Sequence, residues 1–343
     1  MKRIFSIFFF SWILWACSNS ADALFDDLDV GNSIPAEGVR VTEKAEAFLF
    51  DTLQAKEAKL VFRNDETGNL VYIHYSKDST RIYEFDSDID VYHPMISPDG
   101  KFVAFSTALE GINRNSHVYV QELSANPQTL KRLNDKGVIP RWRVHAMEDT
   151  VLIYVNNAGV NVREFLWSTM KTQKVSFRHG EFGEPETILE GAYHGGVTED
   201  LRLAVTGGRY FRVHSTIGGV FQDTVWYEYN QVCNVSLSTD GSLRSLFLDL
   251  GADQGIQFSG ESYLAHHRIL VMDSTGNLIQ SIPSPEGYSF DHPEWIYGSD
   301  RYISFTLTSD IHEKIAVLDI QDSSVHVLVS GNEIWHPDLW INK

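Results

Sequence analysis

Residues 93–105 read HPMISPDGKFVAF and predict a strand, a tight turn and a second strand. Pro94 fixes its own φ and biases the preceding residue, His93, toward extended backbone. In the turn, Pro98 presets φ at the second position and Gly100 tolerates a positive φ. The apolar and aromatic residues after the turn are typical of a strand. This stretch therefore predicts a hairpin, and related stretches recur along the chain.

The recurrence of this hairpin predicts the architecture. Similar strand starts lie at positions 93, 139, 194, 233, 292 and 336, separated by 46, 55, 39, 59 and 44 residues. A period in the forties with about four strands per unit is that of a propeller blade. Only one strand follows the last start, and residues 60–85 hold about three strands without a start of their own, so the two ends together complete a blade. We expect an all-β fold, a six-bladed β-propeller closed by pairing of the N- and C-terminal strands, with seven blades as the alternative.

The repeat also resembles a known family. Residues 93–105, with Val118-Tyr119-Val120 and Arg132-Leu133, resemble the repeats of TolB-like β-propellers, whose pattern centres on Ser-Pro-Asp-Gly-Lys. Residues 292–305 match more loosely, because Tyr297-Gly298-Ser299-Asp300 replaces Ser-Pro-Asp-Gly. The resemblance covers about residues 60–343 and implies the fold. It does not imply a function, because such repeats serve scaffolds, peptidase propellers and some sugar-acting enzymes.

Composition excludes one class of partner. The 343 residues include 46 Asp and Glu against 28 Lys and Arg, a net charge of −18. Such a surface repels the phosphate backbone of nucleic acids, so we expect no nucleic-acid partner. The 43% hydrophobic content is that of an ordinary globular protein.

The N-terminus predicts export. Lys2 and Arg3 precede an apolar run too short to span a membrane comfortably, so residues 1–16 are interpreted as a signal peptide. The run ends in Leu14-Trp15-Ala16-Cys17, which resembles the lipobox of bacterial lipoproteins and implies lipidation of Cys17. The resemblance implies sorting to the outer membrane, because Ser18 rather than an Asp follows the cysteine. The alternative is an ordinary cleaved signal with an incidental cysteine.

The rest of the chain divides into two parts. Residues 17–38 are acidic without apolar periodicity and predict a tether, and residues 39–343 predict the propeller domain. At the start of that domain we expect a strand at residues 47–50 and a short helix at 52–59.

Histidines recur at the strand starts and suggest a metal site. Equivalent blade positions lie at one height around a propeller channel, so His93, His194, His292 and His336 are candidate ligands for zinc or a similar divalent metal. Oligogalacturonate lyases are similar in using propeller histidines as ligands. The alternative is that these histidines pack and hydrogen-bond at the strand entrances, as repeat-encoded histidines more often do. We therefore expect no cofactor and retain a divalent metal as the alternative.

A second candidate site is aromatic. Arg141, Trp142 and Trp226 suggest a platform for a sugar or peptide, although aromatic residues in strands also serve core packing. The sequence has no Gly-x-Ser-x-Gly elbow, which argues against a serine peptidase, and no catalytic residue is assigned.

These observations support two functional hypotheses. The first is a lipid-anchored protein of the cell envelope, attached to the membrane through Cys17, whose propeller is a non-catalytic binding or scaffold module for an envelope protein or polysaccharide. The second is a metal-dependent polysaccharide lyase or hydrolase that uses the histidine ring at the channel mouth. Arg141 or Arg209 would then neutralise a carboxylate of the substrate.

Overall fold

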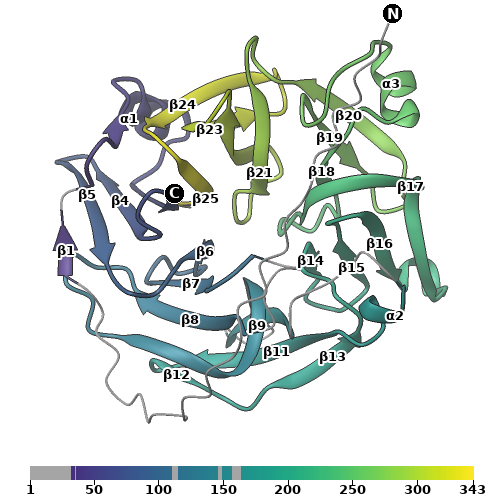
Figure 1. Ribbon diagram of the computed structural model, residues 1–343, viewed down its shortest axis with the longest axis horizontal. Helices are drawn as coiled ribbons and strands as arrows, with labels where there is room; N and C mark the ends of the chain where they lie inside the picture. Colours follow the sequence, from purple (N-terminus) through teal and green to yellow (C-terminus); the bar gives the residue numbers. More distant parts are fainter. Residues whose placement is uncertain (1–31, 35, 110–114, 146–148, 157–163) are drawn as a thin grey trace, which may run out of the picture.

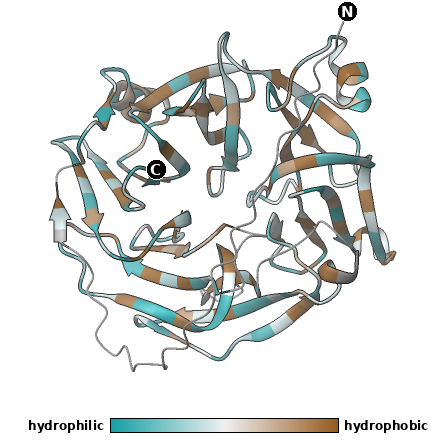
Figure 2. Cartoon of the chain, in the orientation of Figure 1, coloured by the Kyte–Doolittle hydropathy of each residue, from teal (hydrophilic) through white to brown (hydrophobic). Residues whose placement is uncertain are grey.

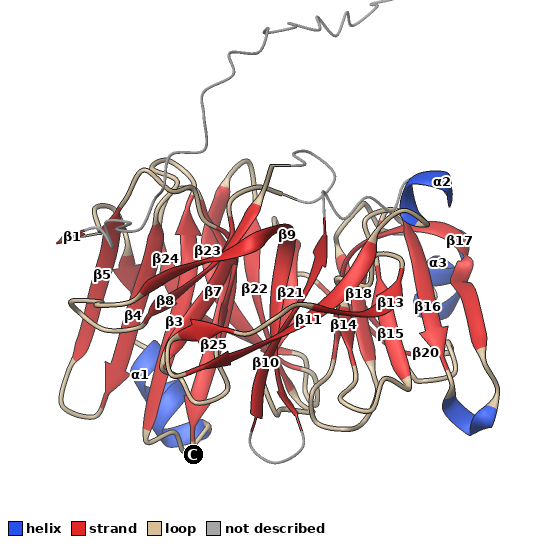
Figure 3. Cartoon of the chain, turned by 90° about the horizontal axis from the view of Figure 1, so that it is seen from below, coloured by secondary structure: helices blue, strands red, loops and turns tan. Residues whose placement is uncertain are grey.

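The computed structural model describes residues 32–34, 36–109, 115–145, 149–156 and 164–343. Four antiparallel sheets account for most of these residues and are arranged around a common centre (Figure 1). Seen edge-on, most strands cross the thickness of the molecule and the loops gather at its two rims (Figure 3). The predicted signal peptide, residues 1–16, together with Cys17 and most of the predicted tether, lies outside the described residues.

Two of the sheets have five strands each. The first has the order β1-β5-β4-β3-β25 and consists of β1 (Asn32–Ile34), β3 (Glu57–Asn64), β4 (Leu70–Ser76), β5 (Thr80–Asp86) and β25 (Ile334–Asn342). The other has the order β2-β24-β23-β22-β21 and consists of β2 (Arg40–Val41), β21 (Ser289–Trp295), β22 (Tyr302–Thr308), β23 (His312–Asp319) and β24 (Ser324–Ser330).

The other two sheets are larger. An eight-stranded sheet contains β6 (Tyr92–Ile96), β7 (Phe102–Ser106), β8 (His117–Glu122), β9 (Leu130–His145), β10 (Asp149–Asn156), β11 (Lys171–Arg178), β12 (Glu181–Phe182) and β13 (Glu186–Glu190). A seven-stranded sheet contains β14 (Gly196–Val197), β15 (Leu203–Thr206), β16 (Tyr210–Ser215), β17 (Gln222–Leu237), β18 (Ser245–Asp249), β19 (Arg268–Met272) and β20 (Leu278–Pro283). Each sheet contains one strand of 16 residues that pairs with one neighbour along its first part and with another along its second part. Strand β9 pairs first with β8 and then with β10, and β17 pairs first with β16 and then with β18.

The end of the chain joins the first sheet. Strand β25 pairs antiparallel with β3, so that Leu339 lies opposite Leu60 and Trp335 lies opposite Arg63. At the other edge of that sheet, β1 pairs with β5. The last part of the predicted tether, 32–34, is therefore an edge strand rather than free linker.

Helices are short. They are α1 (Ala45–Ala47), the π-helical turn η1 (Phe48–Thr52), α2 (Glu164–Trp167), the 3₁₀ turn η2 (Ile217–Gly219) and α3 (Asp253–Ser259). The strand expected at 47–50 and the helix expected at 52–59 are both wrong, because helical turns occupy 45–52 and β3 begins at Glu57. Buried Phe48 and Leu49 pack into the core between the two five-stranded sheets, and this packing selects the helical turn. No helix in the described ranges is long and apolar enough to cross a bilayer.

The core follows the alternation of the strands. Apolar and polar residues alternate along many of them (Figure 2), and the apolar faces meet in clusters between neighbouring sheets. Leu246 and Ile303, for example, belong to one cluster shared by the seven-stranded sheet and its five-stranded neighbour. Each fully buried aliphatic side chain contributes roughly 1.5–3 kcal/mol, so these clusters hold the sheets against one another.

The turn at Ser97-Pro98-Asp99-Gly100 is confirmed. Gly100 has φ +70°, and its N–H donates to the carbonyl of Ser97 at 2.8 Å. Asp99 Oδ1 accepts hydrogen bonds from Ser97 Oγ at 2.6 Å and from the backbone N–H of Lys101 at 3.1 Å. Gly241 and Gly298, at the related turns, also have positive φ, of 85° and 71°.

The inner strands carry a bulge that the sequence did not predict. In β6, β9, β17, β21 and β25, two residues oppose a single residue of the partner strand. The first residue of each pair has a φ between 44° and 54°; these residues are His93, Ile139, Asn234, His292 and His336. The expectation of an extended His93 is therefore wrong. The left-handed conformation costs about 1–3 kcal/mol per residue and re-aims the side chain.

The residue opposite each bulge is aromatic and buried. These residues are Phe105, Tyr154, Phe247, Phe305 and Phe62. A large ring beneath the bulge supplies the packing that offsets its backbone strain.

Candidate metal centre

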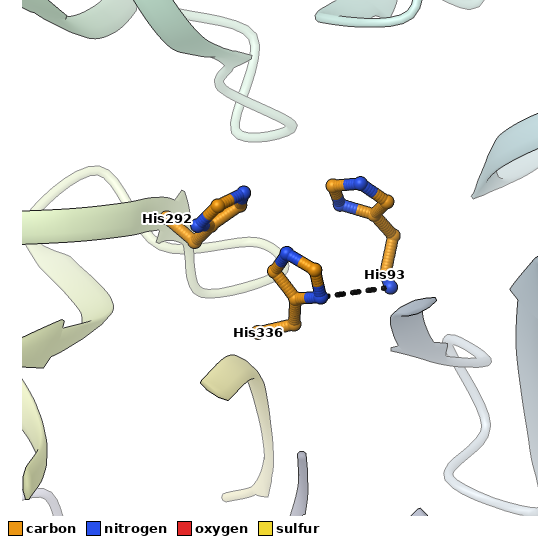
Figure 4. Close-up of side chains that lie close together, drawn as sticks. All are labelled: His93, His292 and His336. Atoms are coloured by element: carbon orange, nitrogen blue, oxygen red, sulfur yellow. Dashed lines mark hydrogen bonds between the residues drawn. The ribbon is translucent and has the colours of Figure 1, made fainter. Parts of the chain in front are cut away.

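Three of the four predicted histidines meet near the centre of the molecule. His93 comes from β6, His292 from β21 and His336 from β25, so each belongs to a different sheet (Figure 4). One ring nitrogen of each lies within 4.8 Å of those of the other two. The ring centroid of His336 is 4.2 Å from that of His93 and 4.0 Å from that of His292. The bulges bring them together, because each imidazole leaves a left-handed residue at an equivalent strand position.

His336 has the character of a metal ligand. It is 3% exposed, and its Nε2 is buried without a hydrogen-bond partner among the described residues. Burial, together with the nearby His292 and His93, holds the pKa of His336 well below its ordinary value, so the ring is neutral at neutral pH. A neutral imidazole nitrogen is the form that binds a metal.

The backbone N–H of His93 donates to Nδ1 of His336 at 3.4 Å, the dashed line in Figure 4. Coordination through Nε2 places the ring proton on Nδ1, so binding of a metal would break this long contact.

His292 lies beside a carboxylate. Its Nδ1 is 2.9 Å from Asp291 Oδ1 but makes no hydrogen bond within the described residues, and Asp291 Oδ1 accepts the backbone N–H of His292 at 2.9 Å. Asp291 also accepts hydrogen bonds from Asn234 Nδ2 and Trp335 Nε1, both at 2.9 Å. Burial by itself would raise the pKa of Asp291, but His292 and His312 hold it well below its ordinary value. In protein metal sites a carboxylate commonly accepts the ring N–H of a ligating histidine, and Asp291 lies close enough to Nδ1 of His292 to take that role when a metal binds.

The donor set fits a borderline divalent ion such as Zn²⁺. Three imidazoles and an open position are a common ligand set for zinc. With Zn–N bonds of about 2.1 Å, the nitrogen atoms of tetrahedral ligands lie about 3.4 Å apart. The three histidine nitrogens now lie within 4.8 Å of one another, so small side-chain rotations would have to shorten these distances when zinc binds. The cavity beside them has a volume of about 10 Å³, which is room for one water-sized group.

An ion pair lies next to the histidines. Arg141 on β9 and Glu294 on β21 form two parallel hydrogen bonds of 2.7 Å, and Arg141 Nε also donates to the carbonyl of His194. Burial raises the pKa of Glu294, but the attraction and hydrogen bonds of Arg141 outweigh it, so the net pKa is lowered. Asp338 Oδ2 accepts the backbone N–H of Ile96 at 2.6 Å, and burial raises the pKa of Asp338 to about 7.

His194 lies outside the group of three. It is buried, but its φ is not positive and the strand start at β14 has no bulge. At the other strand starts, a buried aromatic residue of the partner strand lies opposite the bulge. On β15 and just after it, the corresponding residues are Thr206 and Gly207, which have no large ring to pack beneath a bulge.

The predicted aromatic platform is not assembled. Trp142 is 2% exposed, donates Nε1 to the carbonyl of Met95 at 2.9 Å and packs edge-on against Phe177. Trp226, on β17, packs against Phe211 in the core of another sheet. The guanidinium of Arg141 already forms two hydrogen bonds with Glu294. Reasoning from the sequence missed Glu294, although it stands only two residues after a predicted ligand, His292.

Comparisons with known proteins identify the fold. No family model matches the chain, and no curated protein matches it. Among solved structures, TolB from Acinetobacter baumannii is 13% identical, with a TM-score of 0.54, over 87% of this chain and 71% of that one. A protein of unknown function from Bacteroides caccae is 9% identical, with a TM-score of 0.50, over 83% and 99%. A puromycin-hydrolyzing peptidase from Mycobacterium tuberculosis is 11% identical, with a TM-score of 0.40, over 88% and 57%.

Similarity at these identities concerns the fold alone. The chain has an all-β fold of the TolB-like β-propeller kind, and the sequence-based prediction is confirmed at this level. One fold can serve unrelated functions, so function has to be argued from the site.

Proposed function

We propose that this protein is a binding or scaffold propeller of the cell envelope, with a divalent metal held in its channel by His93, His292 and His336. The convergence of these three imidazoles, from three sheets, carries the proposal. A metal at this point would tie β6, β21 and β25 together and fix the geometry of the channel.

The ring would have six blades. Because β9 and β17 each extend from one four-stranded unit into the next, the four sheets regroup into β6-β9, β9-β12, β14-β17, β17-β20, β21-β24 and the unit of β25 with β3, β4 and β5. In the last unit the C-terminal strand pairs with N-terminal strands, which is the closure we propose.

A binding role suits the site better than catalysis. The 10 Å³ cavity at the histidines admits an ion or a water molecule but not a sugar ring. Arg141, the residue expected to neutralise a substrate carboxylate, already holds Glu294 through two hydrogen bonds.

Metal binding is tested by elemental analysis of the full-length protein purified in detergent. After equilibration with Zn²⁺ and dialysis, we expect about one equivalent in the wild type and a large loss in His292→Ala and in His336→Ala. His179→Ala is the control, because His179 is an exposed histidine in the turn between β11 and β12. Wild-type protein that retains no zinc, or variants that retain as much as the control, would exclude the metal site.

Attachment to the envelope rests on the sequence of residues 1–17. Cells grown with labelled palmitate should label the wild type but not Cys17→Ser, and fractionation should place the wild type with the outer membrane. Labelling that is equal in the two proteins would rule out lipidation of Cys17. The partner would be sought by pull-down from envelope extracts and on polysaccharide arrays, and silence in both would count against a binding role.

A metal-dependent polysaccharide lyase or hydrolase is the second candidate. The three-histidine set with an open position favours it, because such sets also activate water or polarise a carbonyl group. Incubation of the zinc-loaded protein with acidic glycans would then give products that disappear in His292→Ala. Absence of product from the metal-loaded wild type would exclude the lyase or hydrolase and favour the binding role.

A further inference from the structure

A second buried arginine, Arg143, has no carboxylate partner among the residues that the structure describes. Arg143 is 8% exposed; its Nε donates to the carbonyl of Val197 at 2.9 Å and its Nη1 to that of Trp142 at 2.8 Å. Its Nη2 is buried and has no hydrogen-bond partner in the described part of the chain. Nη2 carries two N–H donors, so part of a buried cation is left unsatisfied.

The neighbouring arginine shows what is missing. Arg141 and Arg143 stand two residues apart on β9 and point to the same face. Glu294 neutralises Arg141 with two hydrogen bonds, whereas none of the ion pairs in the described residues includes Arg143. Burial, with the repulsion of Arg141, lowers the pKa of Arg143 to about 10, so the guanidinium is still charged at neutral pH. A buried cation without a counter-charge destabilises the fold, and a bound anion would offset that cost.

Arg143 lines a pocket of about 470 Å³. The walls come from three turns that follow inner strands: Thr198–Arg202, Ser238–Leu243 and the turn that contains Tyr297. The volume lies in the range of ordinary small-molecule sites, and it is far larger than the cavity at the histidines.

Gly196 lies directly against the free nitrogen. Its φ is +133°, and a Cβ at this position would lie 2.9 Å from Arg143 Nη2. A side chain at position 196 would therefore press on the guanidinium.

We infer that this pocket binds a small molecule through a carboxylate group, which pairs with the guanidinium of Arg143. A carboxylate is a charged acceptor that can take the hydrogen bonds left unused by Nη2. The guanidinium of Arg143 carries one positive charge without a partner in the described residues, and a carboxylate supplies one negative charge. A phosphate dianion would in addition meet Glu199 and Asp200 in the wall of the pocket, where only Asp200 is neutralised, by Arg202.

Two sources of a carboxylate fit the volume, the C-terminus of a short peptide and a sugar acid. The inference deepens the proposed binding role by naming the ligand chemistry, and it does not depend on the metal, which lies beyond Arg141 and Glu294.

The test compares matched pairs of probes on the full-length protein by isothermal titration calorimetry. N-acetyl-Ala-Ala is paired with its C-terminal amide, and glucuronate is paired with glucose. We expect saturable binding of at least one acid, binding at least about tenfold weaker for its neutral analogue, and a loss of about tenfold or more in Arg143→Met. Arg81→Met is the control, because Arg81 is exposed on β5. The acid that binds more tightly identifies the source.

Several results would overturn the inference. These are no saturable binding of either acid, equal affinity for acid and neutral analogue, or undiminished affinity in Arg143→Met. Zinc content is measured on the same Arg143→Met protein. Normal zinc content with lost acid binding separates this site from the metal centre, and loss of both properties means that the variant has disturbed the channel. In that case Arg143→Lys, which keeps the charge, should recover zinc but bind the acid more weakly than the wild type; if it binds the acid as tightly as the wild type, the paired recognition is refuted.

Discussion

Replacing Gly100 with alanine tests how the turn of residues 97–100 is held against the C-terminal strand. A Cβ on Gly100 would lie 2.6 Å from Cζ2 of Trp340, on the C-terminal strand β25. The indole ring has little freedom to move, because its Nε1 donates to the carbonyl of Pro98 at 2.8 Å. Lys59 Nζ lies 5.4 Å from the ring centroid and donates to the carbonyl of Gly100 at 2.8 Å.

Two costs add in Gly100→Ala. A non-glycine residue at φ +70° costs roughly 1–2 kcal/mol. Forcing a methyl group into a well-packed contact costs a further 1–3 kcal/mol or so. The related turns provide matched controls, because Gly241 and Gly298 have positive φ but nothing within 4 Å of an added Cβ. Gly241→Ala and Gly298→Ala should therefore show only the first cost.

Urea unfolding followed by tryptophan fluorescence measures these differences. We expect Gly100→Ala to lower the free energy of unfolding by about 2–5 kcal/mol and Gly241→Ala by about 1–2 kcal/mol. In a Trp340→Ala background the excess should vanish, and Gly100→Ala should then cost no more than Gly241→Ala. Equal costs for the two glycines in the wild-type background would refute the packing of β25 against the turn.

Three further changes follow from the ion pairs and the sheet edges. Glu294→Gln should lower the free energy of unfolding by about 3–5 kcal/mol, because it leaves buried Arg141 unpaired, and adding Arg141→Met should restore most of the loss in urea unfolding. Burial alone would lower the pKa of His312, but its hydrogen bonds, first that to Asp291, raise it above the ordinary value. The stability lost in His312→Gln should therefore be largest below about pH 6.5 and shrink as the pH rises through the folded pKa, as urea curves at several pH values would show. Deletion of residues 334–343 removes β25 and exposes the edge of its partner strand, so it should abolish cooperative unfolding and cause association on size-exclusion chromatography.

Each of these expectations has a contrary outcome. Additive losses in the double variant would mean that the arginine and the glutamate stabilise the fold independently. A cost of His312→Gln that grows with pH would reverse the sign assigned to its pKa. A truncated chain that remains monomeric and unfolds cooperatively would show that β25 is dispensable.

Much of the fold could be predicted because its signals are local. The turn of residues 97–100 is encoded by its own Pro, Asp and Gly, and its recurrence sets the period of the strands. By contrast, the helical turns at 45–52 depend on where Phe48 and Leu49 pack, and a short apolar run alone does not distinguish a helix from a strand.

The site was predictable in position but not in geometry. The repeat places His93, His292 and His336 at equivalent points, yet a proline after the first of them favours extended backbone. The left-handed bulge forms in place of extended backbone because the aromatic residue beneath it packs in the core. His194 has no aromatic residue opposite it, and it lies outside the group of three histidines. Pairing of Arg141 with Glu294 joins residues 153 positions apart, which no local pattern reveals.

The two long strands have a mechanical consequence. Strands β9 and β17 each run through two neighbouring units without a loop, whereas β5 and β6, β13 and β14, β20 and β21, and β24 and β25 are connected by loops alone. A force across the ring, or a spontaneous opening, would therefore part the molecule between sheets and leave the units joined by β9 or β17 moving as rigid pairs. In native-state hydrogen exchange, the amides of such a pair would become exposed together.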